Sequence, residues 1–305
     1  MSKLASDSNC RLAHSLEIRL KRLQLFGTLP LTLEAPVFSK LSPRYLIISA
    51  ILSSIVAYFL LFSVSYQSVY LRPLSAALFD ATSCVYTLVP PTATLVLVKK
   101  RFVFESAVNE LLAMRAKLGL GEARYPIVVK LYLALYGVLT TCSMVNIAVA
   151  IRLSPDLYSW MNIIDDACWD TFFAIMALTC SQFMFLIYST GECFSRLMTM
   201  IPKKGQTVLP HVDIRRFIKN YDTIVDLAYE IFECYDIVVG ETLLSNFTCM
   251  MAHGSALLIS NIFNPFKQNE FSIWVPYHLF SLTALMITCV SISSKVSRVQ
   301  YHKFS

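Results

Sequence analysis

The stretch HVDIRRFIKNYDTIVDLAYEIFECYD (211–236), followed by IVVGETLLSNFTCMMAHGSALLISNIF (237–263), decides how this chain folds. Its first half is charged and amphipathic, whereas its second half is apolar on all sides. It contains no proline and only two glycines, Gly240 and Gly254. At about 1.5 Å per residue, one continuous helix of this length would be roughly 80 Å long, far more than the roughly 30 Å of a bilayer core. We therefore predict one helix that begins in water as an amphipathic rod and then enters the membrane.

The composition of the whole chain indicates a polytopic membrane protein. Its 305 residues are 56% hydrophobic and 15% charged, with a mean hydropathy of +0.57, whereas soluble domains carry roughly 25% charged residues. A soluble protein this apolar would expose large apolar patches. The nine cysteines show no CxxC pair and no metal-ligand spacing, so we expect no metal and no other cofactor, and those within apolar runs should behave as small hydrophobes.

The apolar runs predict an all-α fold with six transmembrane helices, at residues 45–66, 74–98, 127–151, 164–190, 237–263 and 276–294. A cytosolic amino-terminal segment (1–44) precedes them, and a cytosolic tail (295–305) follows them. Helix five carries a long cytosolic extension, the stalk 211–236. The transmembrane bundle with this stalk spans residues 45–294.

The connections between the predicted helices differ in character. Residues 99–124 are amphipathic and basic, and Gly119 and Gly121 suit a helix end there. Residues 191–210 are basic and turn-rich, and residues 264–274 form a short loop. Within the amino-terminal segment, prolines interrupt the chain and favour a linker at positions Pro30, Pro36 and Pro43.

The distribution of basic residues predicts the topology. Cytosolic loops of membrane proteins carry an excess of Lys and Arg. Here 23 of the 26 lie in residues 1–44, 99–130, 191–236 and 295–305, and the other side holds only Arg72, Arg152 and Lys267. Both termini and the stalk are therefore expected in the cytosol. The net charge of +6 is accounted for by loops that face anionic lipid, and implies no nucleic-acid partner.

An apolar stripe runs along the predicted stalk. Its members recur at helical spacing, while most of the charged residues lie off it. Such a stripe must pack on something, either the 99–124 helix of the same chain or a neighbouring subunit. The stripe consists of Ile214, Phe217, Ile218, Tyr221, Ile224, Val225, Ala228, Ile231, Phe232 and Tyr235.

No signature of an enzyme occurs in the chain. The patterns GxSxG, HExxH, GxxxxGK and GxGxxG are all absent. The five histidines are scattered, and only His253 falls in mid-membrane, where we interpret it as a hydrogen-bonding residue of the bundle rather than a ligand-binding one. We therefore expect that the chain is not an enzyme.

Polar and aromatic residues gather at similar depth in the outer half of the predicted bundle. Pockets for small molecules are mainly apolar and aromatic, with a few placed polar groups. The alternative is that Trp and Tyr act as anchors at the membrane interface. Asp80 and Asp170 are the strongest candidates, because carboxylates at membrane depth are costly without a role. The candidate ligand-binding residues are Tyr66, Asp80, Asn146, Trp169, Asp170, Phe173, Asn261, Trp274, Tyr277 and His278.

The plan of the chain resembles the insect gustatory receptors, seven-span chemoreceptors related to insect odorant receptors. The resemblance lies in LQLFGTLPL (23–31), in DTFFAIMALTCSQFMFLIYSTGECFSRL (170–197) and in KNYDTIVDLAYEIFECYDIVVGETLLSNF (219–247). It implies a ligand-gated cation channel that detects small-molecule tastants in the plasma membrane of chemosensory neurons. It also implies a homo- or hetero-tetramer with other receptor subunits, held together by the cytosolic stalks.

The sequence departs from that family at its carboxyl end. The family signature is a Thr-Tyr pair, five residues and Gln-Phe in a seventh span that lines the pore. Here SLTALMITCVSISSKVSRVQYHKFS (281–305) contains no such motif. The expectation is a truncated or divergent member without its pore helix.

Three other classes fit the sequence less well. A small six-span secondary transporter is the alternative, but transporters often show two similar halves, and spans one to three do not look like spans four to six. A G-protein-coupled receptor requires an outside amino terminus, which the charge distribution opposes. A membrane-embedded enzyme would need His, Asp or Glu at catalytic spacing near the inner face.

Overall fold

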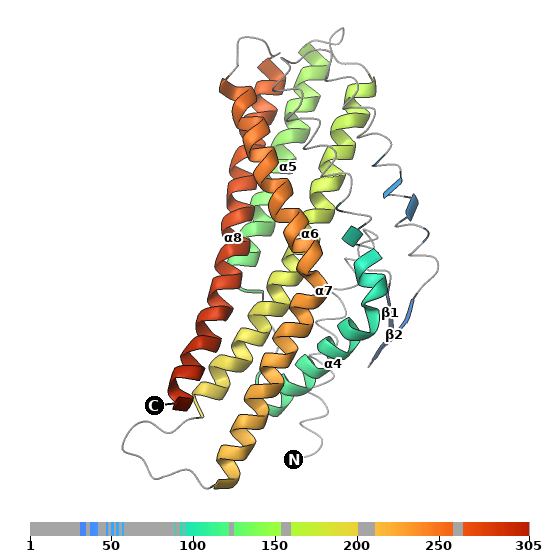
Figure 1. The fold of residues 1–305 in the computed structure, drawn as a ribbon. Coiled ribbons are helices and arrows are strands. Elements are labelled where there is room, and N and C mark those ends of the chain that lie inside the picture. The colour runs from blue at the N-terminus through green and yellow to red at the C-terminus, as the bar shows by residue number, and fades with distance from the viewer. Residues whose placement is uncertain are drawn as a thin grey trace.

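Four long helices form an elongated bundle, and a shorter helix packs along one end of it (Figure 1). The computed structural model describes residues 31–34, 37–41, 95–121, 125–153, 160–200, 211–258 and 265–304, together with isolated positions between 47 and 93. The long helices are α5 (Ile127–Leu153), α6 (Trp160–Met198), α7 (His211–Leu258) and α8 (Pro265–Phe304), and the shorter one is α4 (Arg101–Lys117). Successive long helices run in opposite directions (Figure 1).

The helix α7 confirms that the stretch that begins at His211 forms one continuous helix. It runs without interruption over 48 residues, which at 1.5 Å per residue is about 72 Å. Residues 259–263, the last of the predicted helix, lie outside the described part of the chain. The charged first half and the apolar second half therefore belong to one rod.

Three described helical segments are long and apolar enough to cross a membrane: Ile127–Leu153, Trp169–Met198 and Ser272–Ser294. The helix α5 begins at Ile127, the residue at which the third predicted span begins. The predicted spans 45–66 and 74–98 lie largely outside the described residues. The predicted fifth span, in the second half of α7, is not among the three segments.

Large apolar side chains point away from the bundle on several helices. In the apolar half of α7 they include Leu244, Phe247 and Met251, and on α8 they include Leu279, Met286, Ile287 and Val290. Exposed apolar surface of this extent is typical of contact with lipid or protein rather than water. The structure is thus that of a helical membrane protein.

Several helix ends differ from the predictions, and the segment predicted as a tail from residue 295 is helical as far as Phe304. The helix α6 continues to Met198 instead of ending at residue 190, because Cys193, Phe194 and Leu197 extend its buried face by helical spacing. The helix α8 begins at Pro265, so residues predicted as a loop are helical. Proline suits the first position of a helix, where its missing N–H is not needed, and Pro276 lies inside α8 rather than at its start.

A two-stranded hairpin departs from the expectation of a purely helical chain. The strands β1 (Leu31–Glu34) and β2 (Val37–Leu41) pair antiparallel within the segment predicted as a linker. Leu31 pairs with Leu41, and the register shifts between Thr32 and Leu33. The β-branched residues Thr32 and Val37 favour extended backbone, a signal that the flanking prolines masked.

The apolar stripe of the stalk packs on α4 and α6 of the same chain, so the first of the two alternatives for its partner is correct. Phe104 of α4 and Phe183 of α6 both contact the ring of Tyr235, with centroids 6.2 and 5.6 Å apart. Tyr221 packs edge-on against Phe194 of α6. Ile224, Ile231 and Tyr235 are buried, whereas Ile214, at the start of the stripe, stays exposed.

Charged groups join α4, and Lys100 directly before it, to α7. Lys117 Nζ donates to Asn220 Oδ1 at 2.6 Å. Lys100 donates to the backbone oxygen of Glu233 and forms ion pairs of 3.6 Å with Glu233 and Asp236. Near these contacts, burial raises the pKa of the Cys234 thiol to about 12. That thiol therefore stays protonated.

The end of α4 is a glycine cap, as predicted. Gly119 has a φ of 65°, a left-handed conformation that favours glycine. Gly119 N–H donates to Ala116 O, and Leu120 N–H donates to Arg115 O. Together these two bonds are a Schellman motif, which satisfies carbonyls that the helix end would otherwise leave unbonded.

Candidate ligand-binding site

Aromatic rings from three helices pack together in the half of the bundle opposite the stalk. We call this set the aromatic cluster: Tyr132 and Tyr136 of α5, Trp169, Phe172 and Phe173 of α6, and Trp274, Tyr277, His278 and Phe280 of α8. Phe173 is its centre. It stacks on Trp274 at 4.4 Å and lies 5.9 Å from Tyr277 and 5.4 Å from His278.

Helical spacing explains why these side chains converge. Tyr132 and Tyr136 lie four residues apart on α5, as do Trp169 and Phe173 on α6, so each pair shares one helix face. Trp274, Tyr277 and His278 follow the same pattern on α8. Offset and edge-to-face pairs of this kind contribute about 0.5–1.5 kcal/mol beyond area burial.

A chain of buried polar groups continues from this cluster into the neighbouring helix. We call it the polar chain; in order it runs Tyr277, Tyr132, Ser281, Asn246, His278. The hydroxyls of Tyr132 and Tyr277 lie 3.0 Å apart, and Tyr132 Oη lies 3.4 Å from Ser281 Oγ. Asn246 Nδ2 donates to Ser281 Oγ at 3.1 Å. All five side chains are fully buried.

The hydrogen bonds of Asn246 determine the tautomer of His278. Asn246 Nδ2 also donates to Thr242 O at 2.9 Å, and a backbone carbonyl can only accept. The amide oxygen Oδ1 therefore faces His278 Nδ1, which lies 2.9 Å away. Because Oδ1 can only accept, Nδ1 carries the hydrogen, and in the neutral ring Nε2 keeps its lone pair.

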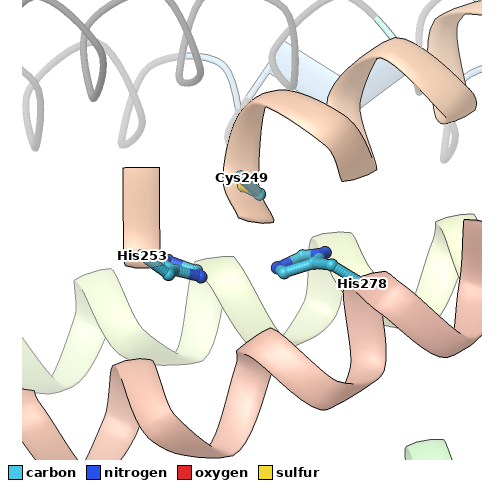
Figure 2. Close-up of side chains that lie close together, drawn as sticks. All are labelled: Cys249, His253 and His278. Atoms are coloured by element: carbon cyan, nitrogen blue, oxygen red, sulfur yellow. The ribbon is translucent and has the colours of Figure 1, made fainter. Parts of the chain in front are cut away.

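His278 also takes part in a second group of side chains. Cys249 and His253 lie four residues apart on α7, and the ring of His253 is 5.3 Å from that of His278. One ligand-capable atom of each residue lies within 4.8 Å of the others. Figure 2 shows the two imidazoles pointing toward one another, with Cys249 beside the gap between them. We call these residues the Cys249–His253–His278 triad.

The structure brings together six of the ten residues predicted for a ligand site. Trp169, Phe173, Trp274, Tyr277 and His278 all belong to the aromatic cluster. Asp170 is buried beside them, and its backbone oxygen accepts a 3.0 Å hydrogen bond from Tyr136.

Of the other four predicted residues, the structure describes only Asn146. Asn146 is half-buried on α5, ten residues beyond Tyr136, which places it about 15 Å farther along that helix. Tyr66, Asp80 and Asn261 fall outside the described residues.

Several residues of the site were not predicted from sequence. Tyr132 and Tyr136 carry a detectable signal, two tyrosines one turn apart in an apolar helix. Asn246 and Ser281 resemble ordinary polar residues of a span. Cys249 and His253 show an i, i+4 spacing typical of helical metal ligands, but the third member of their triad comes from another helix, so no sequence motif includes it.

Comparison with known families agrees with this architecture. A family model described as 7tm Chemosensory receptor matches residues 19–301. The chain belongs to this chemosensory receptor family. No individual curated protein matched the sequence. This match confirms the resemblance to chemoreceptors. Members of the family are membrane receptors that bind small molecules and are typically non-enzymatic.

Proposed function

We propose that this chemosensory receptor binds a small, neutral tastant at the aromatic cluster and the polar chain, as a plasma-membrane subunit of a ligand-gated cation channel. The described groups there are aromatic rings, hydroxyls, an amide and an imidazole. They suit a ligand with an apolar face and a few hydrogen-bonding groups.

The polar chain is the observation that carries this proposal. Polar side chains within a membrane bundle are costly, and those retained there mark functional sites by default. Five fully buried polar residues from three helices form one connected network. A ligand that exchanges hydrogen bonds with this network would change how α5, α7 and α8 are held together.

The helix α7 offers a mechanical link from the site to the cytosol. Asn246 lies on it within the polar chain, and the stalk residues that pack on α4 and α6 lie on the same continuous helix. Asn246 and Glu230 are 16 residues apart, about 24 Å along the axis. Displacement of α7 at Asn246 would thus reach the stalk, where we propose that receptor subunits join as a tetramer.

Tryptophan fluorescence tests ligand binding directly. The chain holds three tryptophans, and Trp169 and Trp274 both belong to the aromatic cluster. The full chain would be purified in lipid nanodiscs as the Trp160→Phe variant, which leaves only these two reporters. It would then be titrated with a panel of sugars, alkaloids and amino acids. We expect saturable quenching or a spectral shift with at least one neutral compound.

Variants separate this site from non-specific partitioning. Phe173→Ala should weaken saturable binding at least tenfold, because Phe173 contacts five other rings of the cluster. The matched control is Phe247→Ala, an exposed aromatic of α7, which should leave binding unchanged. Equal loss in both variants, or no saturable response to any compound, would overturn the proposed site. Saturable uptake of a labelled compound into proteoliposomes would favour the secondary transporter instead.

The topology is tested independently. We propose that both termini and the stalk face the cytosol, as the distribution of basic residues predicts. Epitope tags at either end should stain only after the cells are permeabilised. Staining of the amino-terminal tag on intact cells would contradict this arrangement.

A further inference from the structure

The Cys249–His253–His278 triad has the composition of a metal site. It lies at the edge of the aromatic cluster, with which it shares only His278. All three residues are buried, with exposed fractions of 1%, 8% and 0%. Their ligand atoms lie within 4.8 Å of one another. In a bound site with metal–nitrogen bonds of about 2.0–2.1 Å and metal–sulfur bonds of about 2.3 Å, neighbouring ligand atoms are roughly 3.3–3.8 Å apart. Small side-chain rotations would close the remaining distance.

A hydrogen bond to Asn246 orients the His278 imidazole so that its Nε2 can bind a metal. Its Nδ1–H is held by Asn246 Oδ1 at 2.9 Å, which leaves the lone pair of Nε2 for coordination. Metal-bound histidines almost always donate a hydrogen bond from their other ring N–H to an oxygen in this way. Asn246 is itself held by hydrogen bonds to Thr242 O and Ser281 Oγ, so the orientation of the His278 imidazole is fixed.

We propose that the triad binds one Cu⁺ ion, through the thiolate of Cys249 and the imidazoles of His253 and His278. Binding releases the Cys249 thiol proton to solvent. A thiolate with two neutral imidazoles and Cu⁺ is uncharged overall, whereas Zn²⁺ would leave one positive charge, which is costly at membrane depth. Thiolate is also a soft ligand that selects Cu⁺.

Coordination would join α7 to α8. Cys249 and His253 lie on α7 and His278 on α8, and His278 also contacts Phe173 and Tyr277 of the aromatic cluster. The ion would therefore hold these two helices at the edge of the proposed tastant site. Metal binding itself requires no tastant, so the two proposals fail separately.

A direct titration tests the site. The full chain in nanodiscs would be titrated with Cu⁺ against a Cu⁺-specific chelator under anaerobic reducing conditions, with Zn²⁺ and the redox-inert Ag⁺ in parallel. We expect one Cu⁺ or Ag⁺ per chain, bound more tightly than Zn²⁺. X-ray absorption at the copper edge should show one sulfur and two nitrogens, and the midpoint of thermal unfolding should rise.

Variants identify the ligands. Cys249→Ser and His253→Ala should each weaken Cu⁺ binding at least tenfold, and Asn246→Ala about 10- to 100-fold through the orientation of His278. The control is Cys234→Ser, a buried cysteine of the same helix outside the triad, which should bind as the unchanged chain does. His253 is the least buried ligand, so its variant keeps the test valid if Cys249→Ser fails to fold. Binding unaffected by His253→Ala, tighter binding of Zn²⁺, or no stoichiometric binding would overturn the proposal.

Discussion

The hydroxyl oxygens of Tyr132 and Tyr277 lie 3.0 Å apart where α5 meets α8, and neither residue is exposed. The rings of the same two residues are stacked, with centroids 6.0 Å apart. A polar bond and an apolar contact therefore join the same pair of residues. In a bilayer core no water is present to replace the bond when it is lost.

Tyr132→Phe should destabilise the bundle by about 1–2 kcal/mol. The variant keeps the ring but breaks the bonds of Tyr132 Oη to Tyr277 and Ser281, and loss of a buried hydrogen bond costs about 1–3 kcal/mol. The measurement is thermal or denaturant unfolding of the full chain in detergent micelles. Ser281→Ala combined with Tyr132→Phe should cost less than the sum of the two single changes, because the residues share one network.

Thr283→Ala is the matched control for that experiment. Its hydroxyl is exposed and bonds only to the carbonyl of Leu279 in its own helix, so the stability should change by less than about 0.5 kcal/mol. If Tyr132→Phe were as mild as this control, the polar chain would not hold α5 to α8.

Gly119→Ala should destabilise the α4 end by about 1–2 kcal/mol, the cost of a left-handed conformation for a residue with a Cβ atom. A Cβ at Gly119 meets nothing within 4 Å, so the cost is in the backbone alone. Gly121→Ala is the control, because its φ is not positive and its Cβ also meets nothing within 4 Å. Limited proteolysis near residue 120, together with unfolding curves, measures both. Equal behaviour of the two variants would contradict the cap.

Arg115→Lys should cost about 3 kcal/mol, although the charge is kept. The guanidinium of Arg115 is 2% exposed and contacts Glu192 Oε2 at 2.5 Å, Gly121 O at 3.1 Å and Ser189 O at 3.4 Å. A lysine cannot reach all three partners from one position, and a buried donor or acceptor that loses its partner costs about 1–3 kcal/mol, more for a charged group. The unfolding midpoint in detergent measures the loss.

Arg196→Lys controls for the substitution itself. Arg196 is exposed and donates to Leu118 O at 3.3 Å, close to where Arg115 acts. We expect a change within about 0.5 kcal/mol. A loss as large as that of Arg115→Lys would show that surface contacts, and not the buried guanidinium, hold α4 to α6.

Much of the fold could be predicted from the sequence, because helical periodicity and the absence of breakers act locally. The range of α7 from His211, the beginning of α5 and the glycine cap at Gly119 all follow from such patterns. The end of α6 did not, because the turns there remain helical when Cys193, Phe194 and Leu197 are buried by tertiary packing. The beginning of α8 did not either, since the polar residues after Pro265 predict a loop but are helical.

The site divides in the same way. Aromatic residues such as Trp169 and Trp274 stand out in a sequence, and depth alone was enough to group them. The proximity of Cys249 and His253 to His278 cannot be predicted in this way, because it depends on the register of α7 against α8, which no local pattern encodes. Asn146 stays a prediction: it lies ten residues beyond Tyr136 on α5, about 15 Å farther along the helix, so it is not among the residues that the cluster brings together.

Glu230→Gln should stabilise the stalk at neutral pH by about 0.5 kcal/mol. Burial, followed by the nearby charges of Glu110, Asp226 and Glu233, raises the pKa of the Glu230 carboxyl above its ordinary 4.5. Asp226 lies four residues before it, and like charges at this spacing destabilise a helix by about 0.2–0.5 kcal/mol. Because the folded-state pKa is raised, the folded state binds the proton more tightly than the unfolded state does.

The sign of the pH dependence follows from that difference. Protonated Glu230 favours the folded state, and this contribution is present in full below the unfolded pKa and is lost as the pH rises through the folded pKa. The advantage of Glu230→Gln over the unchanged chain should therefore be largest at neutral pH and vanish as the pH falls toward 4.5. Unfolding midpoints across this range measure it. Glu105→Gln is the control: Glu105 lies one turn after Arg101 on α4, so removing its charge should not stabilise the chain. A gain from Glu230→Gln that is independent of pH would show that packing, and not the carboxylate charge, limits the stalk.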